Sequence, residues 1–315
     1  MKQTRRKFIK NSLITSAAAF FAPGLFINSD VHAETKYKLN YKPEPHDWKD
    51  EHLTVAWLGH STILINFFGK WVLTDPVLFE RVGVYLFGSS LGPSRITPPA
   101  LNVEEIPKPD LILLSHAHYD HMDYPTIKHF AELYPGQIDV VVAYLTNDVV
   151  EDLEWKSLTI LDWNDEVSLP NFRIKAFEVK HFGWRMPWEK DRSRGYIKDG
   201  RSFNSYVIER EGKKIFFAGD TAMTDKFISA KNENVDIAIM PVGAYNPWKW
   251  NHCNPEEALK MAESINAKYI IPVHTKTFRQ SSEPFEEPID WLKKSVVNYS
   301  VKLGLEEIGQ TFKLS

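Results

Sequence analysis

The residues best suited to chemistry lie in one short stretch, 113–123, which reads LLSHAHYDHMD. It holds His116, His118, Asp120 and His121 within six positions, in a chain that has 11 histidines in all. Residues two apart in an extended chain point to the same side, so His116 and His118 can hold one metal ion. Asp120 and His121 come where the chain turns and would face a second ion. Imidazole and carboxylate ligands suit zinc, and also iron or manganese, and the lack of thiolates argues against a closed structural zinc site.

Three more residues of ligand type follow apolar, strand-like runs: His181, Asp220 and His274. A histidine at a strand end, or a Gly-Asp turn, is more often structural when it stands alone. Rigid strands that end at one edge of a sheet bring such side chains together, and we therefore expect these three to join the 116–121 cluster. A surface histidine cluster, or core histidines that the backbone satisfies, is the alternative.

The elements that must position these residues are short. Apolar runs rich in Val, Ile and Phe, bounded by Gly, Pro, Asn or Asp, predict many strands. Two of them, ILINF at 63–67 and FRIKA at 172–176, alternate as half-buried strands do. Helices are predicted at 124–136, 254–267 and 287–299, the second with Asn254 as N-cap. We expect an α/β protein with one domain, 51–315, of two sheets with helices outside, after a loose lead-in at 34–50.

Composition excludes some classes of function. The formal net charge is -3, so the chain has no broad basic surface for nucleic acid, and no nucleic-acid partner is expected. Cys253 is the one cysteine, which excludes an internal disulfide framework.

Residues 1–33 have the pattern of an export signal. Arg5 and Arg6 precede the apolar run SLITSAAAFFAPGLFI, and VHA ends at Ala33 as a small-residue cleavage site. The Arg pair resembles the twin-arginine signal, which predicts recognition of the precursor by the twin-arginine export machinery and a periplasmic location. An uncleaved anchor is the alternative, but the apolar run is shorter than the ~20 residues that a spanning helix needs.

The motifs together resemble a known family. H-x-H-x-D-H, a later His, a Gly-Asp and a final His resemble the metallo-β-lactamase superfamily, from WLGHSTILI at 57–65 to PVHTKTF at 272–278. SHAHYDHMDY, FFAGDT and PVGAYNPWKWNHCNPEEAL at 241–259 are similar to its N-acylphosphatidylethanolamine phospholipase D branch. The segments 180–195 and 79–95 depart from that pattern, so substrate identity carries over poorly.

The resemblance implies a four-layer αβ/βα sandwich with a two-zinc site. By matching position, one metal ion would be held by His116, His118 and His181. The other would be held by Asp120, His121 and His274. Asp220 would bridge the two ions.

Two metal ions would share a bridging water and lower its pKa toward ~7, and the resulting hydroxide would attack phosphorus or a carbonyl carbon. The sequence therefore predicts a zinc-dependent hydrolase, with Asp120 orienting the nucleophile. A phosphodiester such as an N-acylphosphatidylethanolamine-type phospholipid is the expected substrate. A lactonase or amide hydrolase is the first alternative, and a metal-binding protein without turnover is the second.

His252 stands apart from the predicted ligands, since no apolar strand leads into it. It lies just before the helix that begins near Asn254, whose N-terminal end favours an anion such as phosphate. A histidine occupies the matching position in the resembling branch. We therefore expect His252 to act catalytically on the substrate phosphate or leaving oxygen, with a surface or helix-start histidine as the alternative.

Other residues are predicted to surround the site. His60 and Asp75 follow strand-like runs and are expected to orient ligands, or else to be buried polar groups that the backbone satisfies. The run 77–87 is expected to be a flap over the metal cleft or, less readily, a contact to a membrane surface. Five aromatic residues would line a site for an amphipathic or lipid substrate, or pack loops: Trp184, Trp188, Tyr245, Trp248 and Trp250.

Overall fold

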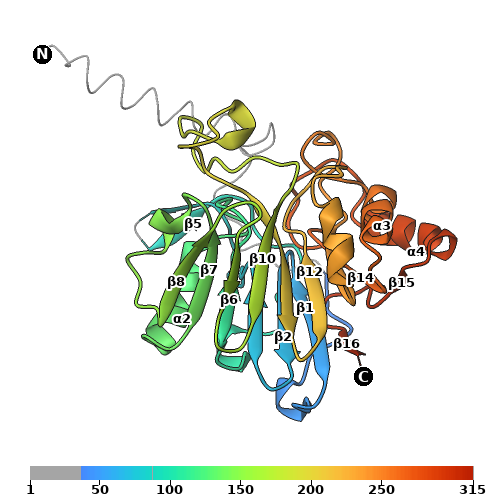
Figure 1. Cartoon of the computed structure of the whole chain (residues 1–315), viewed down its shortest axis with the longest axis horizontal. Helices are drawn as coiled ribbons and strands as arrows, with labels where there is room; N and C mark the ends of the chain where they lie inside the picture. Colours follow the sequence, from blue (N-terminus) through green and yellow to red (C-terminus); the bar gives the residue numbers. More distant parts are fainter. Residues whose placement is uncertain (1–36, 87, 315) are drawn as a thin grey trace, which may run out of the picture.

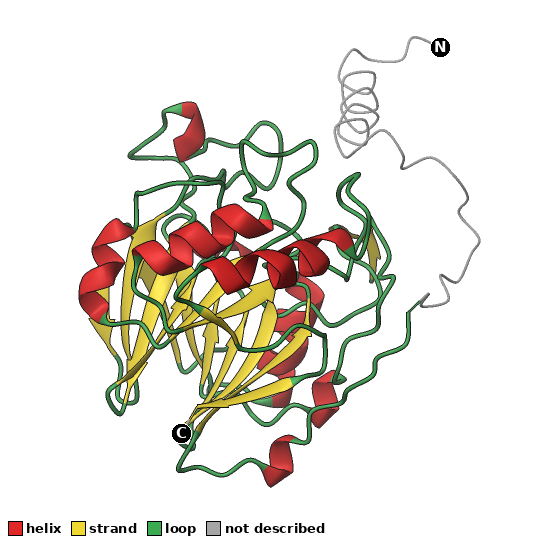
Figure 2. Ribbon diagram, turned by 90° about the vertical axis from the view of Figure 1, so that its right-hand side faces the viewer, coloured by secondary structure: helices red, strands yellow, loops and turns green. Residues whose placement is uncertain are grey.

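Two large β-sheets form the centre of the protein (Figure 1). The computed structural model describes residues 37–86 and 88–314, and the predicted signal at 1–33 lies outside them. The sheets pack against each other, and residues of both belong to one buried core. The predicted four-layer αβ/βα sandwich is confirmed, because helices lie outside the paired sheets (Figure 2). In the described part of the chain, no helix is long and apolar enough to cross a membrane.

The first sheet has the strand order β16-β1-β2-β3-β6-β7-β8. Pairing is antiparallel from β16 to β3 and parallel from β3 to β8. Its strands are β1 (Leu53–Gly59), β2 (Thr62–Phe67), β3 (Trp71–Thr74), β6 (Leu111–Leu113), β7 (Asp139–Ala143), β8 (Ser157–Leu161) and β16 (Thr311–Leu314).

The second sheet has the order β15-β14-β13-β12-β11-β10-β9. Pairing is antiparallel from β9 to β12 and parallel from β12 to β15. Its strands are β9 (Glu166–Ser168), β10 (Arg173–Glu178), β11 (Asn204–Arg210), β12 (Lys213–Phe217), β13 (Ile237–Pro241), β14 (Tyr269–Val273) and β15 (Lys302–Leu303).

The three predicted helices are present, and two of them begin at a side-chain cap. α2 (Tyr124–Leu133) is capped by Asp123, and α3 (Pro255–Ser264) by Asn254, which forms a reciprocal capping box with Glu257. α4 (Glu287–Ser295) is shorter than the predicted 287–299, because the chain tightens into a 3-10 turn at Val296–Asn298. α3 packs against α4 and β13, on the outer side of the second sheet (Figure 2).

One expectation about burial needs correction. The run 63–67 was expected to be half-buried, yet all its residues are buried, because both faces of the sheet are covered at this strand. Its one polar position, Asn66, bonds Asp50 and the Gly69 N–H, which makes a buried amide tolerable. FRIKA does alternate in burial along β10, as predicted.

Most residues in the described part of the lead-in, 37–50, are exposed, but two aromatic contacts attach the segment to the domain. Tyr37 stacks on Phe285 with ring centroids 4.2 Å apart, and Trp48 stacks on Trp71 at 5.5 Å. These two contacts bury part of the apolar surface of the rings, although most residues of the segment are polar.

The run 77–87 divides into an inner and an outer part. Val77, Leu78 and Val82 are buried, whereas the outer part forms a two-stranded hairpin of β4 (Val84–Leu86) and β5 (Ser89–Leu91). Arg95 ties the base of this segment by donating to main-chain carbonyls, including that of Phe79 at 2.9 Å. The segment is therefore part core and part projecting hairpin.

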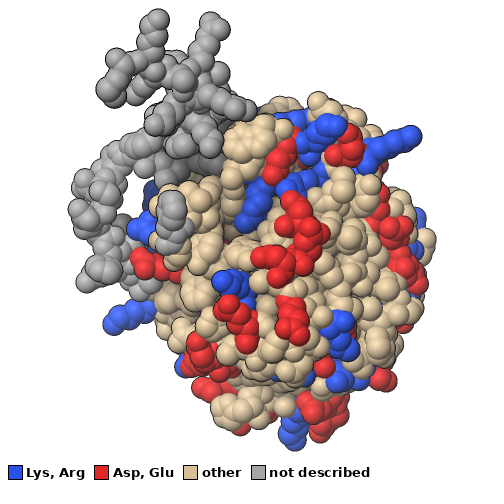
Figure 3. Space-filling model, turned by 90° about the vertical axis from the view of Figure 1, so that its left-hand side faces the viewer, with Lys and Arg blue, Asp and Glu red and all other residues tan. Residues whose placement is uncertain are grey.

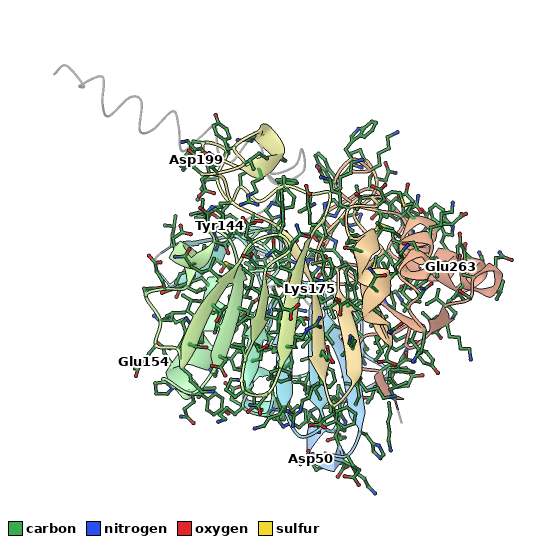
Figure 4. All side chains as sticks on the ribbon, in the orientation of Figure 1. Asp50, Tyr144, Glu154, Lys175, Asp199 and Glu263 are labelled. Atoms are coloured by element: carbon green, nitrogen blue, oxygen red, sulfur yellow. The ribbon has the colours of Figure 1, made fainter. Side chains whose placement is uncertain are left out.

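The strands that lead into the candidate residues all end at one edge of the sandwich, the upper edge in Figure 1. The segment 182–203 projects there, marked by Asp199 in Figure 4, whereas Asp50 marks the opposite edge. Acidic and basic side chains are mixed over the face drawn in Figure 3.

Candidate metal centre

One group of donor atoms forms where β6 and β10 end. Nδ1 of His118 lies 2.8 Å from Nε2 of His116 and 3.2 Å from Nε2 of His181. A carboxylate oxygen of Asp220 completes the group, with all four donor atoms within 4.8 Å of one another. Four ligands about 2.1 Å from a tetrahedral zinc ion would lie roughly 3.4 Å apart, so the spacing fits one ion.

A second group lies beside the first. Oδ2 of Asp120 is 3.5 Å from Nε2 of His274 and 3.8 Å from Nε2 of His121. His60 joins this group, with Nε2 3.0 Å from the same Asp120 oxygen. The structure therefore brings Asp120 and His121 together with His274, as the sequence predicted, and adds His60 to them.

Asp220 lies between the two groups. Its Oδ2 is 3.1 Å from Nε2 of His121 and 3.0 Å from Nε2 of His274, and 3.7 Å from Nε2 of His181. One buried carboxylate thus faces histidines of both groups, which is the geometry that a bridging ligand requires. Its Oδ1 atom is buried with no hydrogen-bond partner.

The outer nitrogens of two histidines are occupied by acceptors. Nδ1 of His121 donates to Oδ2 of Asp75 at 2.7 Å, and Nδ1 of His181 donates to the Asn251 carbonyl at 2.9 Å. The lone pair of each ring therefore stays on Nε2, which faces the centre. Such hydrogen bonds fix the tautomer and ring orientation of metal-binding histidines.

Asp75 also controls His116 through Ser115. The Ser115 hydroxyl donates to Asp75 at 2.5 Å, so it can accept from Nδ1 of His116, which is 2.9 Å away. The Ser115 N–H donates to the other Asp75 oxygen at 2.8 Å. The expectation that Asp75 orients ligands agrees with these contacts. Burial raises its pKa, and the hydrogen bonds from His121 and Ser115 oppose that rise.

The charges of the centre favour cations. Burial would raise the pKa of Asp220, but His121 and His274 hold it well below the ordinary value. Burial would lower the pKa of His274, yet Asp220 and Asp120 raise it to about 9. Burial lowers the pKa of His116 well below its usual value, so that ring is neutral. Two buried carboxylates and the imidazole nitrogens that face them are a donor set that fits divalent metal ions, which would replace the protons on His121 and His274.

His60 is placed to hold Asp120 rather than to bind a metal ion. Burial lowers its pKa to about 3, so the ring is neutral with a single N–H. A carboxylate can only accept, so that hydrogen is on Nε2, facing Asp120. The backbone at this position is held as well, because the main-chain N–H of His60 donates to the Thr277 hydroxyl at 2.6 Å.

His252 lies at the centre, where one of its ring nitrogens is within 4.8 Å of a carboxylate oxygen of Asp220 and of a nitrogen of His274. Its Nδ1 is 3.7 Å from Oδ2 of Asp220 and has no hydrogen-bond partner. Its ring centroid is 5.0 Å from that of His274 and 5.1 Å from that of His181. Burial lowers its pKa well below the usual value. The position at the centre is consistent with a catalytic role and rules out a plain surface histidine.

Two contributors had no signal in the sequence analysis. The Gln280 amide donates to Oδ2 of Asp120 from the loop after His274. Arg185 donates to the carbonyls of Ala117 at 2.8 Å and Met122 at 2.9 Å, so it connects the two ends of the loop that carries the 116–121 cluster. Both residues contact the 116–122 segment from positions far away in the sequence. The sequence offered one indication of this, since both lie in segments that follow predicted ligands.

The five aromatic residues that were predicted to line the site fall into two groups. Trp188 and Trp250 are exposed, at 66% and 69%, and Trp248 is 44% exposed. Trp184 instead stacks near Phe182, with centroids 5.0 Å apart, and the Tyr245 hydroxyl donates to Glu287. Three of the five residues therefore offer apolar surface to a partner, and two pack loops.

The model of the beta-lactamase superfamily domain matches residues 70–275. The chain belongs to the metallo-β-lactamase superfamily. An N-acyl-phosphatidylethanolamine-hydrolyzing phospholipase D of Caenorhabditis elegans is 31% identical over 255 residues, 77% of this chain and 69% of that protein. A metal-dependent hydrolase of Geobacillus thermodenitrificans is 25% identical over 233 residues, 72% of this chain and 87% of that protein.

A Mycobacterium tuberculosis protein is 30% identical over 250 residues, which are 76% of this chain and 63% of that relative. The chain thus spans less than two thirds of the length of that relative. Solved structures support the fold alone. Igni18, a metallo hydrolase of Ignicoccus hospitalis, superposes with a TM-score of 0.59 at 16% identity, covering 84% of this chain and 99% of that chain.

Proposed function

We propose that the protein is a binuclear, zinc-dependent phosphodiesterase that acts on phospholipid headgroups of the N-acylphosphatidylethanolamine type. The observation that carries the proposal is Asp220, a buried carboxylate shared by two separate groups of metal-type donors. The similarity to the Caenorhabditis elegans phospholipase D supports the substrate class. When bound, two divalent ions polarise the bond to be cleaved and lower the pKa of water.

The residues of the chain then have separate tasks. Asp120, held by His60, offers a carboxylate beside the reacting atoms and can accept a proton from the attacking water. His252 has a free Nδ1 facing the same space, from which it can bind a phosphate oxygen or protonate the leaving oxygen. The five histidines predicted as ligands, together with Asp120 and Asp220, would hold the ions, and Asp75 keeps two of those rings in the correct tautomer.

A substrate panel tests this function. Purified, zinc-loaded protein should hydrolyse bis(p-nitrophenyl) phosphate and N-acylphosphatidylethanolamine vesicles, and a chelated sample should do neither. Faster hydrolysis of lactones or amides than of either phosphodiester would contradict the substrate class. Tight metal binding with no turnover of any substrate would contradict catalysis itself.

We propose that the precursor is exported to the periplasm by the twin-arginine machinery, on the strength of Arg5-Arg6 and the site ending at Ala33. The mature chain should begin near Glu34 and occur outside the cytoplasm. Replacement of both arginines by lysine should leave precursor inside the cell. Normal export of that double variant would contradict the proposal.

We also propose contact with a membrane surface at the site edge. The exposed Leu86 and Leu91 on the hairpin support it, as do Trp188, Ile197 and Trp250 on the two rim loops. Aromatic and aliphatic side chains of this kind insert at the headgroup boundary. The protein should pellet with anionic vesicles, and Leu86→Asp together with Leu91→Asp should weaken that association. Unchanged sedimentation of the double variant would argue against a role for the hairpin.

A further inference from the structure

One turn, 246–252, touches both donor groups of the centre. The Trp248 carbonyl accepts the N–H groups of Asn251 at 2.9 Å and His252 at 3.0 Å, which closes the turn. The Asn251 carbonyl accepts from His181, a member of the first group. The Trp248 indole donates to the main-chain carbonyl of Gln280 at 3.2 Å, which leads to the second group.

Gln280 continues this path to a carboxylate at the centre. Its side-chain amide donates to Oδ2 of Asp120, the oxygen that also accepts from His60. The two donors differ in origin. His60 lies between the strands β1 and β2 and is fully buried, whereas Gln280 is half-buried on a surface loop. One donor on Asp120 is therefore rigid, and the other can move with the rim.

The outer end of the path is exposed to solvent. Trp248 is 44% exposed, and its neighbour Trp250 is 69% exposed. An apolar group that packs on these indoles would also press on the turn that holds Gln280. Small displacements matter here, because a misplacement of about 1 Å at a catalytic group can cost on the order of 100-fold in rate.

We infer that Gln280 is a positioning residue for Asp120 and that Trp248 couples it to the rim, so that an apolar substrate chain on the exposed turn helps to set the catalytic carboxylate. The inference rests on the proposed function only for the choice of substrate. The contacts themselves involve residues of the described chain and would act on any substrate that reaches the turn.

The test uses Gln280→Met, which keeps the side-chain length and removes the donor, and Trp248→Phe, which removes the indole N–H. Outer contacts of metal centres typically contribute 10–100-fold in activity or metal affinity. Gln280→Met should lower kcat on bis(p-nitrophenyl) phosphate by about that factor, with KM little changed. Trp248→Phe should lower kcat in the same direction, by less.

The second readout is independent of substrate. In the cobalt-loaded protein, both variants should shift the visible absorption bands of the ion beside Asp120, at full metal content. Trp155→Phe is the matched control, because it removes the same kind of indole-to-carbonyl bond, at 2.9 Å to Val150, in another part of the fold. It should leave both the spectrum and kcat unchanged.

The outcomes separate this inference from the proposed function. An unchanged cobalt spectrum in Gln280→Met would overturn the positioning role, whatever substrate is used. A shift in Gln280→Met with none in Trp248→Phe would overturn the coupling to the rim. If the native protein cleaves no phosphodiester, the proposed function fails, while the cobalt comparison still decides the role of Gln280.

Discussion

The inner and outer sides of the centre are held in different ways. On the inner side, Asp75 and Ser115 are fully buried and fix two histidines through bonds of 2.5–2.9 Å. On the outer side, Gln280 and Arg185 reach the centre from loops that are partly exposed. The inner contacts come from strand ends of the first sheet, and the outer contacts come from segments that follow strands of the second.

This difference separates two requirements of a hydrolase. Metal-binding atoms must keep fixed spacing, and rigid, fully buried strand ends supply it. Substrate must enter and leave, and loops at the rim permit that motion. The comparison predicts that inner substitutions chiefly lower metal affinity, whereas rim substitutions chiefly lower turnover while the metal ions stay bound.

The largest effect is expected at Asp220, which both donor groups share. Asp220→Ala should lose metal and activity together, down to the background of chelated protein, because it removes the carboxylate that faces histidines of both groups. Metal analysis and turnover of the same preparation measure this. Full metal content in Asp220→Ala would show that the carboxylate bridges nothing.

His252 is expected to have the next largest effect, and on turnover alone. His252→Ala should lower kcat by about 10²–10⁴-fold, the usual contribution of a general acid or base. Metal content should stay full, because His252 is not among the seven predicted ligands, although it lies near Asp220 and His274. Loss of an ion from this variant would place His252 among the ligands, and unchanged turnover would remove it from the chemistry.

Asp75 tests the inner side. Asp75→Asn keeps the shape, but an amide either turns its NH2 against the Ser115 N–H or, if it turns over, loses both ring-fixing contacts, since these go to the same oxygen. Metal affinity should fall about 10–100-fold, as for other outer partners of metal-binding histidines. A competition titration with a chelating dye measures it. An affinity equal to that of the unaltered protein would show that the tautomers of His116 and His121 need no support.

Arg185 tests the outer side, with the smallest expected effect on metal. Arg185→Met leaves the carbonyls of Ala117 and Met122 without their donor, which should lower the free energy of unfolding by about 1–3 kcal/mol. Denaturant unfolding measures this. Arg185→Lys is the comparison variant, because it keeps the positive charge but lacks the guanidinium N–H groups. A larger loss of metal affinity in Arg185→Met than in Asp75→Asn would reverse the distinction between inner and outer sides.

The fold and the seven predicted ligands were accessible from sequence for a local reason. Each ligand stands within three residues of a strand end or in the compact 116–121 cluster, so periodicity places it at a sheet edge. The resemblance supplied the division into two sets, and the structure brings those sets together. Their role as ligands stays a prediction until metal is measured.

Long-range contacts were not accessible in this way. Gln280 lies 160 positions from Asp120, and Arg185 lies 68 positions from Ala117. No periodicity or capping pattern connects such pairs, since loop conformation determines them. The packing of Tyr37 on Phe285 could not be predicted for the same reason.

The most direct test of the account is the metal content of fully active protein. Titration of metal-free protein with zinc, followed by elemental analysis after desalting, should give two ions per chain, with turnover rising to its maximum only as the second ion binds. Full turnover at one ion per chain would contradict the shared centre at Asp220, and with it the proposed mechanism.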